Sequence, residues 1–472
     1  MNKPLKLASL AVSFVLLGSS ALKAQDFSLN AVRAADINSA GADKGLFDFT
    51  NPPKPQAKTT KEWTVMVFMN AKNNLSDSQL LGLTGKFAVQ DIAEMKKVGT
   101  TGAVNVVVEH GIKGKGSRRL LIQKSGFLNS GETVYGEYPA ADMGDYKRVI
   151  EFVKWAKTEF PAKHYMLVLW NHGLGWIDPS QKLQTAGTGA EQKGILFDDE
   201  TKNYVRTKQL GEILKTSGYV DVFAMNACLM QMAEIGYEVK DYTGLILGSE
   251  ETMLAQGFDY EKLLNFMNAD PAFTSEQLSD FMVSWYRRFM ADGMHIIGPL
   301  NLPLGSVGAT LSTVRPQALN DLPPYLSAFA NAAMANNEAE AVKKAIESAV
   351  RFSSLAPEKD KKKLIAPYVD LYDFAAVVGA NAAAQETKQA ASALMDFIKT
   401  KLVMRSVGLN ADAENGYDYT KVGGIAINMT MKMKELPAAV NDIYETKYPE
   451  LSLSQASQWD EFVTWADGVW RK

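Results

Sequence analysis

The sequence predicts an α/β fold: a mostly parallel sheet flanked by helices, followed by a helix-rich C-terminal region. Between residues 63 and 250, short apolar runs of strand length alternate with amphipathic segments of helical length. This alternation is typical of parallel sheets with helices on both faces. After residue 310, long alanine-rich stretches with helical spacing predict a largely helical region.

The composition is that of an ordinary globular chain with a large core. Of 472 residues, 46% are hydrophobic and 22% are charged, and the formal net charge is −3. This balance gives no basic field, so we expect no nucleic-acid partner. The single cysteine excludes an intramolecular disulfide and a cysteine-based zinc site, and the four scattered histidines do not suggest a substitute.

The N-terminus has the pattern of a secretory signal. Lys3 and Lys6 precede an apolar stretch over residues 7–22, and Ala24 supplies a small residue for cleavage. The stretch is too short for a membrane span, and no later segment suggests one. We therefore expect residues 1–24 to be a signal peptide and the mature protein to be secreted or periplasmic.

The remaining elements are expected in chain order. Residues 25–60 end in a proline-rich stretch and are predicted to form a leader or pro-segment, because such stretches resist packing. The expected strands of the sheet are residues 63–69, 104–108, 165–170, 220–226 and 243–247. The expected helices are about 79–98, 145–160, 207–216 and 229–237, then 275–290, much of 318–350 and 371–403, and 459–470, with further strands at 295–297 and 423–428.

Cys228, the only cysteine, follows the apolar run that ends at Asn226. A helical pattern begins at Leu229, which predicts Cys228 at a strand-to-helix corner on the first turn of the helix. The N–H groups and partial positive charge of a helix N-terminus favour thiolate over thiol. An exposed nucleophile is therefore one interpretation, and a buried structural cysteine is the other.

Two histidines, His110 and His172, each follow an apolar strand and precede a glycine. In open parallel sheets the functional crevice lies at the carboxyl ends of the strands, where the strand order reverses. A 2-1-3-4-5 order makes the third and fourth strands neighbours and places His172 beside Cys228, with His110 about 14 Å away. His172 is the predicted base, whereas His110, His164 and His295 are interpreted as structural.

A cysteine beside a histidine predicts acyl transfer. The thiol is a strong nucleophile, and the imidazole can take its proton and later protonate a leaving amine. The backbone N–H groups of Cys228 and Gly173 are expected to stabilise the oxyanion, and a side chain at Gly173 would crowd the substrate carbonyl. The predicted activity is that of a hydrolase or transpeptidase.

The residues that carry these features resemble the caspase-like cysteine peptidases, and among them most closely the clostripain family. The matching stretches are VMVFMNAKNNL (65–75), MGDYKRVIEFVKWAK (143–157), YMLVLWNHGLGW (165–176), NACLMQMAEIGYEVKDY (226–242), GSEET (248–252) and VDLYDFA (369–375). The resemblance implies a caspase-like sheet, a Cys228–His172 dyad and endopeptidase activity on protein or peptide substrates. It implies a catalytic domain over residues 61–310, completed by a C-terminal region over 311–472.

Three departures from the family pattern concern specificity. Asn226 stands where the family usually has an aspartate associated with a preference for Arg or Lys before the scissile bond. An amide lacks that charge, so the preferred residue stays undetermined. Gly-Phe at 257–258 replaces the family's Gly-Trp, and Lys72 stands where an acid is common. Ser249 and Glu250 are expected to bind substrate in the cleft, with a solvated loop carboxylate as the alternative for Glu250.

Residues 174–193, rich in Gly, Gln, Thr and Ser, are predicted to be an exposed loop. Family members are often cut in the loop after the catalytic histidine, which makes Lys182 and Lys193 candidate processing positions of a zymogen. A tolerated surface insertion is the alternative. No cofactor is expected; some family members respond to calcium, but the acids here show no calcium-loop spacing.

The leading interpretation is an exported cysteine endopeptidase. One alternative is a catalytically silent binding or inhibitory protein on the same fold, which Asn226 keeps open. Another is a periplasmic small-ligand receptor, because doubly wound sheets also serve that role, although it leaves the His-Gly and Ala-Cys motifs on neighbouring strands unexplained.

Overall fold

The computed structural model describes residues 58–75, 78–80, 83–85, 87–127, 129–179, 194–254, 256–291, 294–297, 300–302, 308–352, 367–411, 416–429 and 445–470. The expected signal peptide, nearly all of the expected leader, and Lys182 and Lys193 lie outside these residues.

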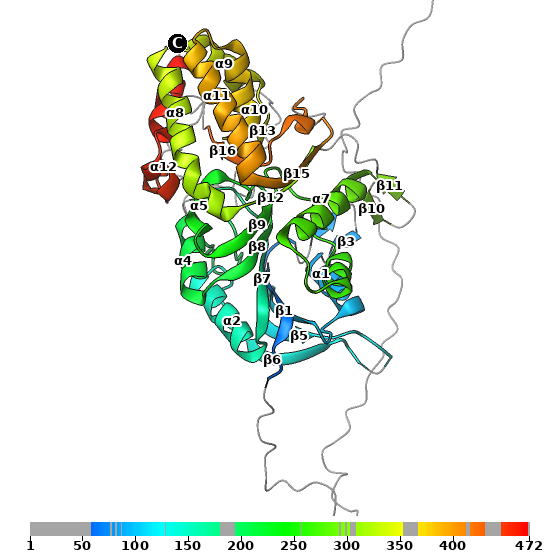
Figure 1. The fold of residues 1–472 in the computed structure, drawn as a ribbon. Helices are drawn as coiled ribbons and strands as arrows, with labels where there is room; N and C mark the ends of the chain where they lie inside the picture. Colours follow the sequence, from blue (N-terminus) through cyan, green and yellow to red (C-terminus); the bar gives the residue numbers. More distant parts are fainter. Residues whose placement is uncertain are drawn as a thin grey trace, which may run out of the picture. The chain divides into compact units, whose positions relative to one another are not determined.

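A nine-stranded sheet forms the centre of the fold (Figure 1). Its strands are β1 (Lys61–Ala71), β4 (Val104–Ile112), β5 (Gly116–Ile122), β6 (Glu132–Tyr138), β7 (Ala162–Trp170), β8 (Val220–Asn226), β9 (Thr243–Gly248), β12 (Ala309–Val314) and β15 (Val403–Leu409). They lie in the order β15-β12-β9-β8-β7-β1-β4-β5-β6. The middle strands β4, β1, β7, β8 and β9 are parallel, which confirms the predicted mostly parallel sheet and the 2-1-3-4-5 order.

The apolar runs that identified these strands are buried on both faces of the sheet. In β1, every residue from Trp63 to Ala71 is buried, and in β7 the same holds from Met166 to Trp170. Strands covered by helices on both faces have continuous apolar runs instead of an alternation with polar residues.

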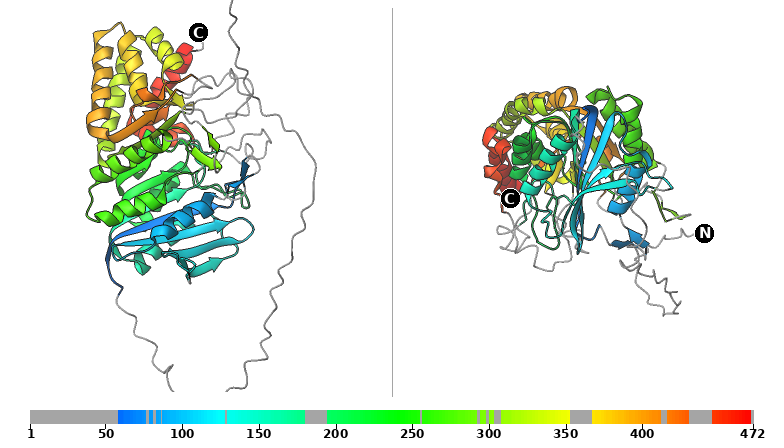
Figure 2. Two further views of the ribbon diagram at one scale, coloured as in Figure 1. Left: turned by 90° about the vertical axis from the view of Figure 1, so that its right-hand side faces the viewer. Right: turned by 90° about the horizontal axis from the view of Figure 1, so that it is seen from below.

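Helices form a layer on each face (Figures 1 and 2). One layer contains α2 (Tyr146–Glu159), α4 (Thr207–Ser217) and α5 (Ala233–Val239), and the other contains α1 (Phe87–Val98), α6 (Tyr260–Ala269) and α7 (Ser275–Ala291). The start of α2 is as expected, because the side chain of Asp145 accepts a hydrogen bond from the N–H of Lys147 and caps the helix.

Two predicted helices begin later than expected. The helix expected from residue 79 begins at Phe87, after the short strands β2 (Ser78–Leu80) and β3 (Leu83–Gly85). Gly82 and Gly85 explain this start, because glycine weakens a helix interior. The helix expected from residue 229 begins at Ala233.

The C-terminal region is helical as predicted, and it also contributes strands that the sequence did not reveal. Its main helices are α8 (Leu322–Ala335), α9 (Ala339–Ser348), α10 (Leu371–Asn381), α11 (Gln385–Phe397) and α13 (Trp459–Trp470), which gather beyond the β15 end of the sheet in Figure 1. β12 and β15 extend the central sheet, so the boundary expected between residues 310 and 311 falls inside β12. A separate small sheet holds β13 (Arg351–Phe352), β14 (Tyr368–Asp370) and β16 (Ala426–Asn428), and β16 confirms the strand expected at residues 423–428.

Among the helices in the described ranges, none has both the length and the apolar character needed to cross a membrane.

Candidate active site

The loops that carry Cys228 and His172 leave the same edge of the sheet. β7 and β8 are parallel neighbours, and Trp170 is paired with Asn226 at their carboxyl ends. His172 and Cys228 each come two residues after this pair. The predicted neighbouring strands are therefore confirmed, and the two loops start at the same level of the sheet.

Gly173 lets the two loops pack against each other. A Cβ atom at Gly173 would lie 2.2 Å from the carbonyl oxygen of Cys228 and 2.8 Å from the side chain of Met230. The sequence suggested that a side chain here would crowd the substrate. The structure gives a different reason, since a side chain here would collide with the backbone of the loop that carries Cys228 even without substrate.

Cys228 does not lie on the first turn of a helix. β8 ends at Asn226, and a turn separates Cys228 from α5. Leu229 has a φ of +64°, which is uncommon for a residue with a side chain and reverses the chain sharply. The turn is fastened to the segment after β9, where the N–H of Leu229 donates to the carbonyl of Glu251 at 3.3 Å. The expected stabilisation of a thiolate by a helix N-terminus is therefore wrong.

Cys228 is half-buried and packs against the apolar core on both faces of the sheet. Its Sγ lies 3.4 Å from the N–H of Met253, which donates to it, and 3.8 Å from the carbonyl of Met253. Burial raises the pKa of Cys228 to about 11; the N–H of Met253 opposes this shift and the Glu251 carboxylate adds to it. In this arrangement the side chain is a neutral thiol at pH 7.

His172 is half-buried, and its Nε2 lies 2.8 Å from Oδ1 of Asn74. An amide oxygen only accepts hydrogen bonds, so this pairing places the ring proton on Nε2 and the lone pair on Nδ1. Asn74 lies in the loop after β1, 98 positions before the histidine. We did not single it out from the sequence, although it lies within the 65–75 stretch that carried the family resemblance.

Buried asparagines join the loop after β1 to the loop after β7. The side chain of Asn171 donates to the carbonyl of Asn70 at 2.6 Å and accepts from the N–H of His172 at 2.6 Å. It also accepts from the N–H of Phe197, and Asn70 donates to the carbonyl of Leu196 at 2.8 Å. The histidine loop therefore depends on the segment that follows residues 180–193.

Asn226 is buried beneath the loop at residues 256–259. Its Nδ2 lies 3.3 Å from the hydroxyl of Tyr260, and a Cβ atom at Gly257 would lie 2.4 Å from the amide atoms. Two acids that we did not single out lie on the same side of the sheet. Asp91 accepts from the indole N–H of Trp170 at 2.7 Å, and Glu94 accepts from the N–H of Tyr260 at 3.0 Å.

Both acids bind their protons more tightly than usual. Burial and then the charge of Glu94 raise the pKa of Asp91 well above its usual range. Burial and then the charge of Asp259 raise the pKa of Glu94 to about 7. Asn226 is thus flanked by carboxyl groups on α1, although its own side chain has no charge.

The structure gives Ser249 and Glu250 buried positions. The hydroxyl of Ser249 lies 2.7 Å from the carbonyl of Thr310 and 2.8 Å from that of Glu251, so its contacts are internal. Glu250 is 1% exposed, and neither of its oxygens accepts a hydrogen bond from a donor in the described ranges. This burial favours a role for both residues in supporting the nucleophile loop.

Glu250 faces Asp370, the N-cap of α10. Asp370 accepts hydrogen bonds from the N–H groups of Asp373, Gly423 and Gly424. Burial raises the pKa of Glu250 well above its usual range, and the nearby charge of Asp370 raises it further. Because Asp370 has several N–H donors and Glu250 has none, we assign the proton between them to Glu250.

The other histidines lie away from this site. His110 is buried in β4, three strand positions from β8, and burial followed by the charge of Arg118 lowers its pKa to about 4. Nδ1 of His164 lies 2.9 Å from Asp221. The side chain of His295 lies outside the described part of the structure.

Lys72 is buried, and its ammonium group contacts two carboxylates and a carbonyl oxygen. Its Nζ lies 3.0 Å from Asp198, 2.7 Å from Glu200 and 2.7 Å from the carbonyl oxygen of Ala141. The lysine therefore supplies an internal cation that ties the loop after β1 to residues 198–200. Within the described ranges, no three His, Cys, Asp or Glu side chains are grouped so as to hold a metal ion.

The parallel sheet, with cysteine and histidine on adjacent loops at its carboxyl edge, defines the class of caspase-like cysteine peptidases. The model of the clostripain family matches residues 67–465. The chain belongs to the clostripain family.

Individual relatives agree with this assignment. Clostripain from Hathewaya histolytica is 27% identical over 140 residues, which cover 27% of this chain and 25% of that protein. The chain thus matches about a quarter of the length of this curated relative.

Two solved structures share the fold. A secreted C11 cysteine protease from Bacteroides thetaiotaomicron, in complex with an irreversible peptide inhibitor, has a TM-score of 0.56 and 17% identity, covering 86% of this chain and 99% of that one. An inactive zymogen C11 protease from Parabacteroides distasonis has a TM-score of 0.56 and 18% identity, covering 84% and 98%.

Proposed function

We propose that this protein is a cysteine endopeptidase that cleaves peptide bonds through Cys228 and His172. The pairing of Trp170 with Asn226 carries this proposal, because it starts both loops at the same level of adjacent strands. The family assignment, the close packing of Gly173 on Cys228 and the contact between His172 and Asn74 support it.

In the proposed reaction, Nδ1 of His172 takes the thiol proton as Sγ of Cys228 attacks the scissile carbonyl carbon. The backbone N–H groups of Cys228 and Gly173 stabilise the oxyanion of the tetrahedral intermediate. The imidazolium then gives its proton to the leaving amine, and water hydrolyses the thioester. Asn74 acts as a positioning residue that keeps the ring proton on Nε2.

The raised pKa of the Cys228 thiol supports a low-activity resting state. A thiol with a pKa of about 11 is a poor nucleophile at pH 7 until a change in its surroundings exposes it. Cutting within residues 174–193, at Lys182 or Lys193, would release the segment on which the histidine loop depends. We therefore propose that the chain is a zymogen activated by processing in this loop.

Recognition of the substrate residue before the scissile bond is proposed to involve Asn226. Its amide can accept a hydrogen bond from a cationic side chain, and Glu94 on α1, with its pKa raised to about 7 by burial, is partly charged at neutral pH. Replacing Asn226 with Asp should raise the preference for Arg and Lys in a peptide-library profile, and an unchanged profile would refute this role.

The same proposal includes the organisation and location of the chain. Residues 1–24 would direct export to the periplasm or the outside, and residues 25–60 would be a leader. The expected catalytic domain over residues 61–310 would be completed by the C-terminal region, with the boundary placed before β12, because β12 and β15 both extend the central sheet.

A peptide acyloxymethyl ketone tests the dyad directly, because it becomes covalently attached to an activated cysteine. We expect one adduct on the processed protein, none on Cys228→Ala, and slow labelling of His172→Ala, with His164→Ala as a matched control that labels normally. Absence of labelling in the folded, processed wild type would refute the peptidase and favour the catalytically silent binding protein. Denaturing gels of wild type and Cys228→Ala test self-processing, and identical single bands would refute it.

A further inference from the structure

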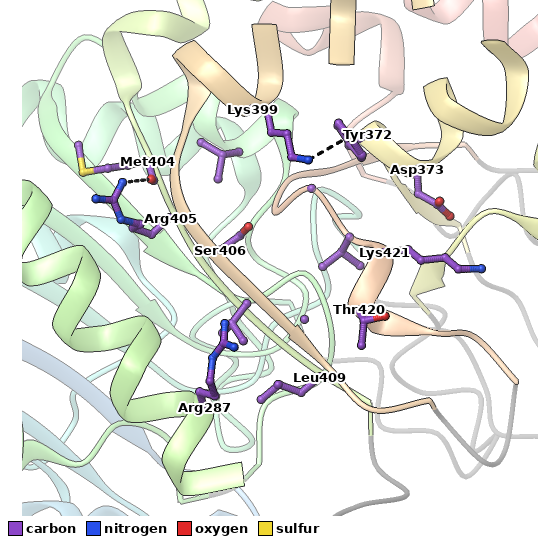
Figure 3. A pocket seen from close by; sticks show the side chains of 15 residues that line it. Arg287, Tyr372, Asp373, Lys399, Met404, Arg405, Ser406, Leu409, Thr420 and Lys421 are labelled. Atoms are coloured by element: carbon purple, nitrogen blue, oxygen red, sulfur yellow. Dashed lines mark hydrogen bonds between the residues drawn. The ribbon is translucent and has the colours of Figure 1, made fainter. Parts of the chain in front are cut away.

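A groove of about 790 Å³ follows strand β15 at the end of the central sheet (Figure 3). The whole of β15 lines it. On one side it is bounded by Arg287 of α7, and on the other by Tyr372, Lys399 and the segment at residues 420–423. β15 is three strand positions from β8, so the groove is separate from the site around Cys228.

The groove exposes the edge of a sheet. β15 pairs with β12 on one side, and in the described ranges no strand pairs with its other side. An unpaired edge presents N–H and C=O groups that an extended peptide can bind as an added strand. The five residues from Val403 to Val407 would pair with about 17 Å of extended chain.

One end of this edge is closed by the chain itself. The N–H of Tyr419 donates to the carbonyl of Asn410 at 3.0 Å, and a Cβ atom at Gly408 would lie 1.8 Å from the carbonyl oxygen of Tyr419. This turn limits the register of an added strand to the segment between Val403 and Val407. In that segment the carbonyl of Val403 accepts from the Arg315 guanidinium at 3.2 Å and that of Met404 from the Arg405 guanidinium at 2.7 Å, so an added strand has to replace such side-chain bonds.

Among the described residues that line the groove, the charged side chains are mainly cationic. Four of them are Arg287, Lys399, Arg405 and Lys421, and the single carboxylate is that of Asp373. The carboxylate of Asp373 already accepts a hydrogen bond from the N–H of Val350 at 2.8 Å. The groove therefore favours a negatively charged ligand.

Two of these cations are available for a new partner. Arg405 is paired with Asp280, and Nζ of Lys399 lies 3.4 Å from the hydroxyl of Tyr372. Arg287 and Lys421 are both exposed, and Lys421 lies close enough to Asp373 and Asp418 for its charge to act on both carboxyl groups. Figure 3 shows Arg287 on one side of β15 and Lys399 and Lys421 on the other, with the amine of Lys421 directed away from the strand, so the three cations do not converge on one point.

We propose that this groove binds an extended peptide segment with acidic side chains, which adds to the sheet as a strand beside β15. The strand edge favours a ligand with an extended backbone. Because the cations are spread apart, they fit several acidic side chains better than one small anion. The site is independent of the peptidase reaction, so a protein that lacks the nucleophile should still bind.

Fluorescence anisotropy with full-length Cys228→Ala tests the proposal without any cleavage. The probe is a labelled seven-residue peptide of alternating Glu and Thr, compared with the same peptide carrying Gln for Glu and with one N-methylated at alternate residues. We expect the acidic peptide to bind about tenfold or more tightly than the Gln peptide, with an affinity that falls as NaCl is raised. The N-methylated peptide should bind weakly, because it cannot complete the strand pairing.

Charge reversal locates the binding. Arg287→Glu combined with Lys421→Glu should weaken binding of the acidic peptide about tenfold or more. Lys215→Glu, at an exposed position of α4, is the matched control and should leave binding unchanged. Both substituted sites are exposed, and equal melting temperatures would verify the fold. Equal binding of the Gln or N-methylated peptide, unchanged binding by the double variant, or equally effective competition by glutarate would overturn the proposal.

Discussion

Alkylation of Cys228 by iodoacetamide should be far slower in the folded, unprocessed chain than in the unfolded chain at pH 7.5. Burial raises the pKa of the thiol to about 11, and the Glu251 carboxylate adds to the shift. At this pKa about 0.03% of the side chain is thiolate at pH 7.5, against about 9% for a thiol with the ordinary pKa of about 8.5. The expected difference in thiolate is about 300-fold.

The assay is direct because the chain has one cysteine, so each adduct in an intact-mass spectrum reports on Cys228. The rate measured from pH 7 to 11 gives the pKa, and the urea-unfolded chain is the reference. Glu251→Gln should lower the pKa by removing a negative charge. Tyr419→Phe is the matched control, because it removes the hydroxyl that donates to Glu251 at 2.5 Å and leaves the charge in place. A folded-state pKa at or below 8.5 would refute the reasoning, since stabilisation of the thiolate would then outweigh burial.

Three further predictions concern the loops and the core. Asn74→Ala should lower kcat about tenfold or more with little change in KM. Asn74→Asp should move the acidic limb of the kcat/KM profile to higher pH, because a carboxylate raises the pKa of the catalytic imidazole. An unchanged pH profile would contradict the positioning role. Gly173→Ala should lower the free energy of unfolding by about 1–3 kcal/mol in urea titrations, because its Cβ would meet the carbonyl of Cys228, whereas Gly102→Ala has open space and should be neutral. Burial raises the pKa of Glu234 to about 7, so the folded state binds this proton more tightly than the unfolded chain. Stability should therefore fall by about 3 kcal/mol as pH rises from about 4.5 to 7, and Glu234→Gln should flatten this dependence in urea titrations at several pH values; equal slopes for the two proteins would contradict it.

The sequence predicted the parallel strands well because their signal is local. The apolar runs at β1, β7 and β8 are continuous and bounded by turns, so each is recognisable without its neighbours. β12 and β15 lack this signal. β12 contains Thr310, Ser312 and Thr313, all buried, and it is stable in the sheet because distant groups bind these hydroxyls, as in the bond from Ser312 to the carbonyl of Gly424.

The candidate site also has residues that the sequence reveals and a residue that it does not. Cys228 and His172 stand out because residue type and position after a strand are properties of the sequence, and the 2-1-3-4-5 order then makes their strands neighbours. The partner of the histidine did not stand out. Asn74 is 98 positions away, and nothing near it in the sequence distinguishes it from the adjacent Asn73.

By itself, the sequence determined the existence of the parallel strands, the nucleophile and base candidates, and membership of the clostripain family. Only the tertiary structure decided that the pKa of the Cys228 thiol is raised, that Glu250 is buried against Asp370, and that a groove with several cationic side chains follows β15. The physical reason is that strand patterns arise from neighbours along the chain. Desolvation, pKa shifts and surface grooves arise instead from atoms that segments far apart in the sequence bring together.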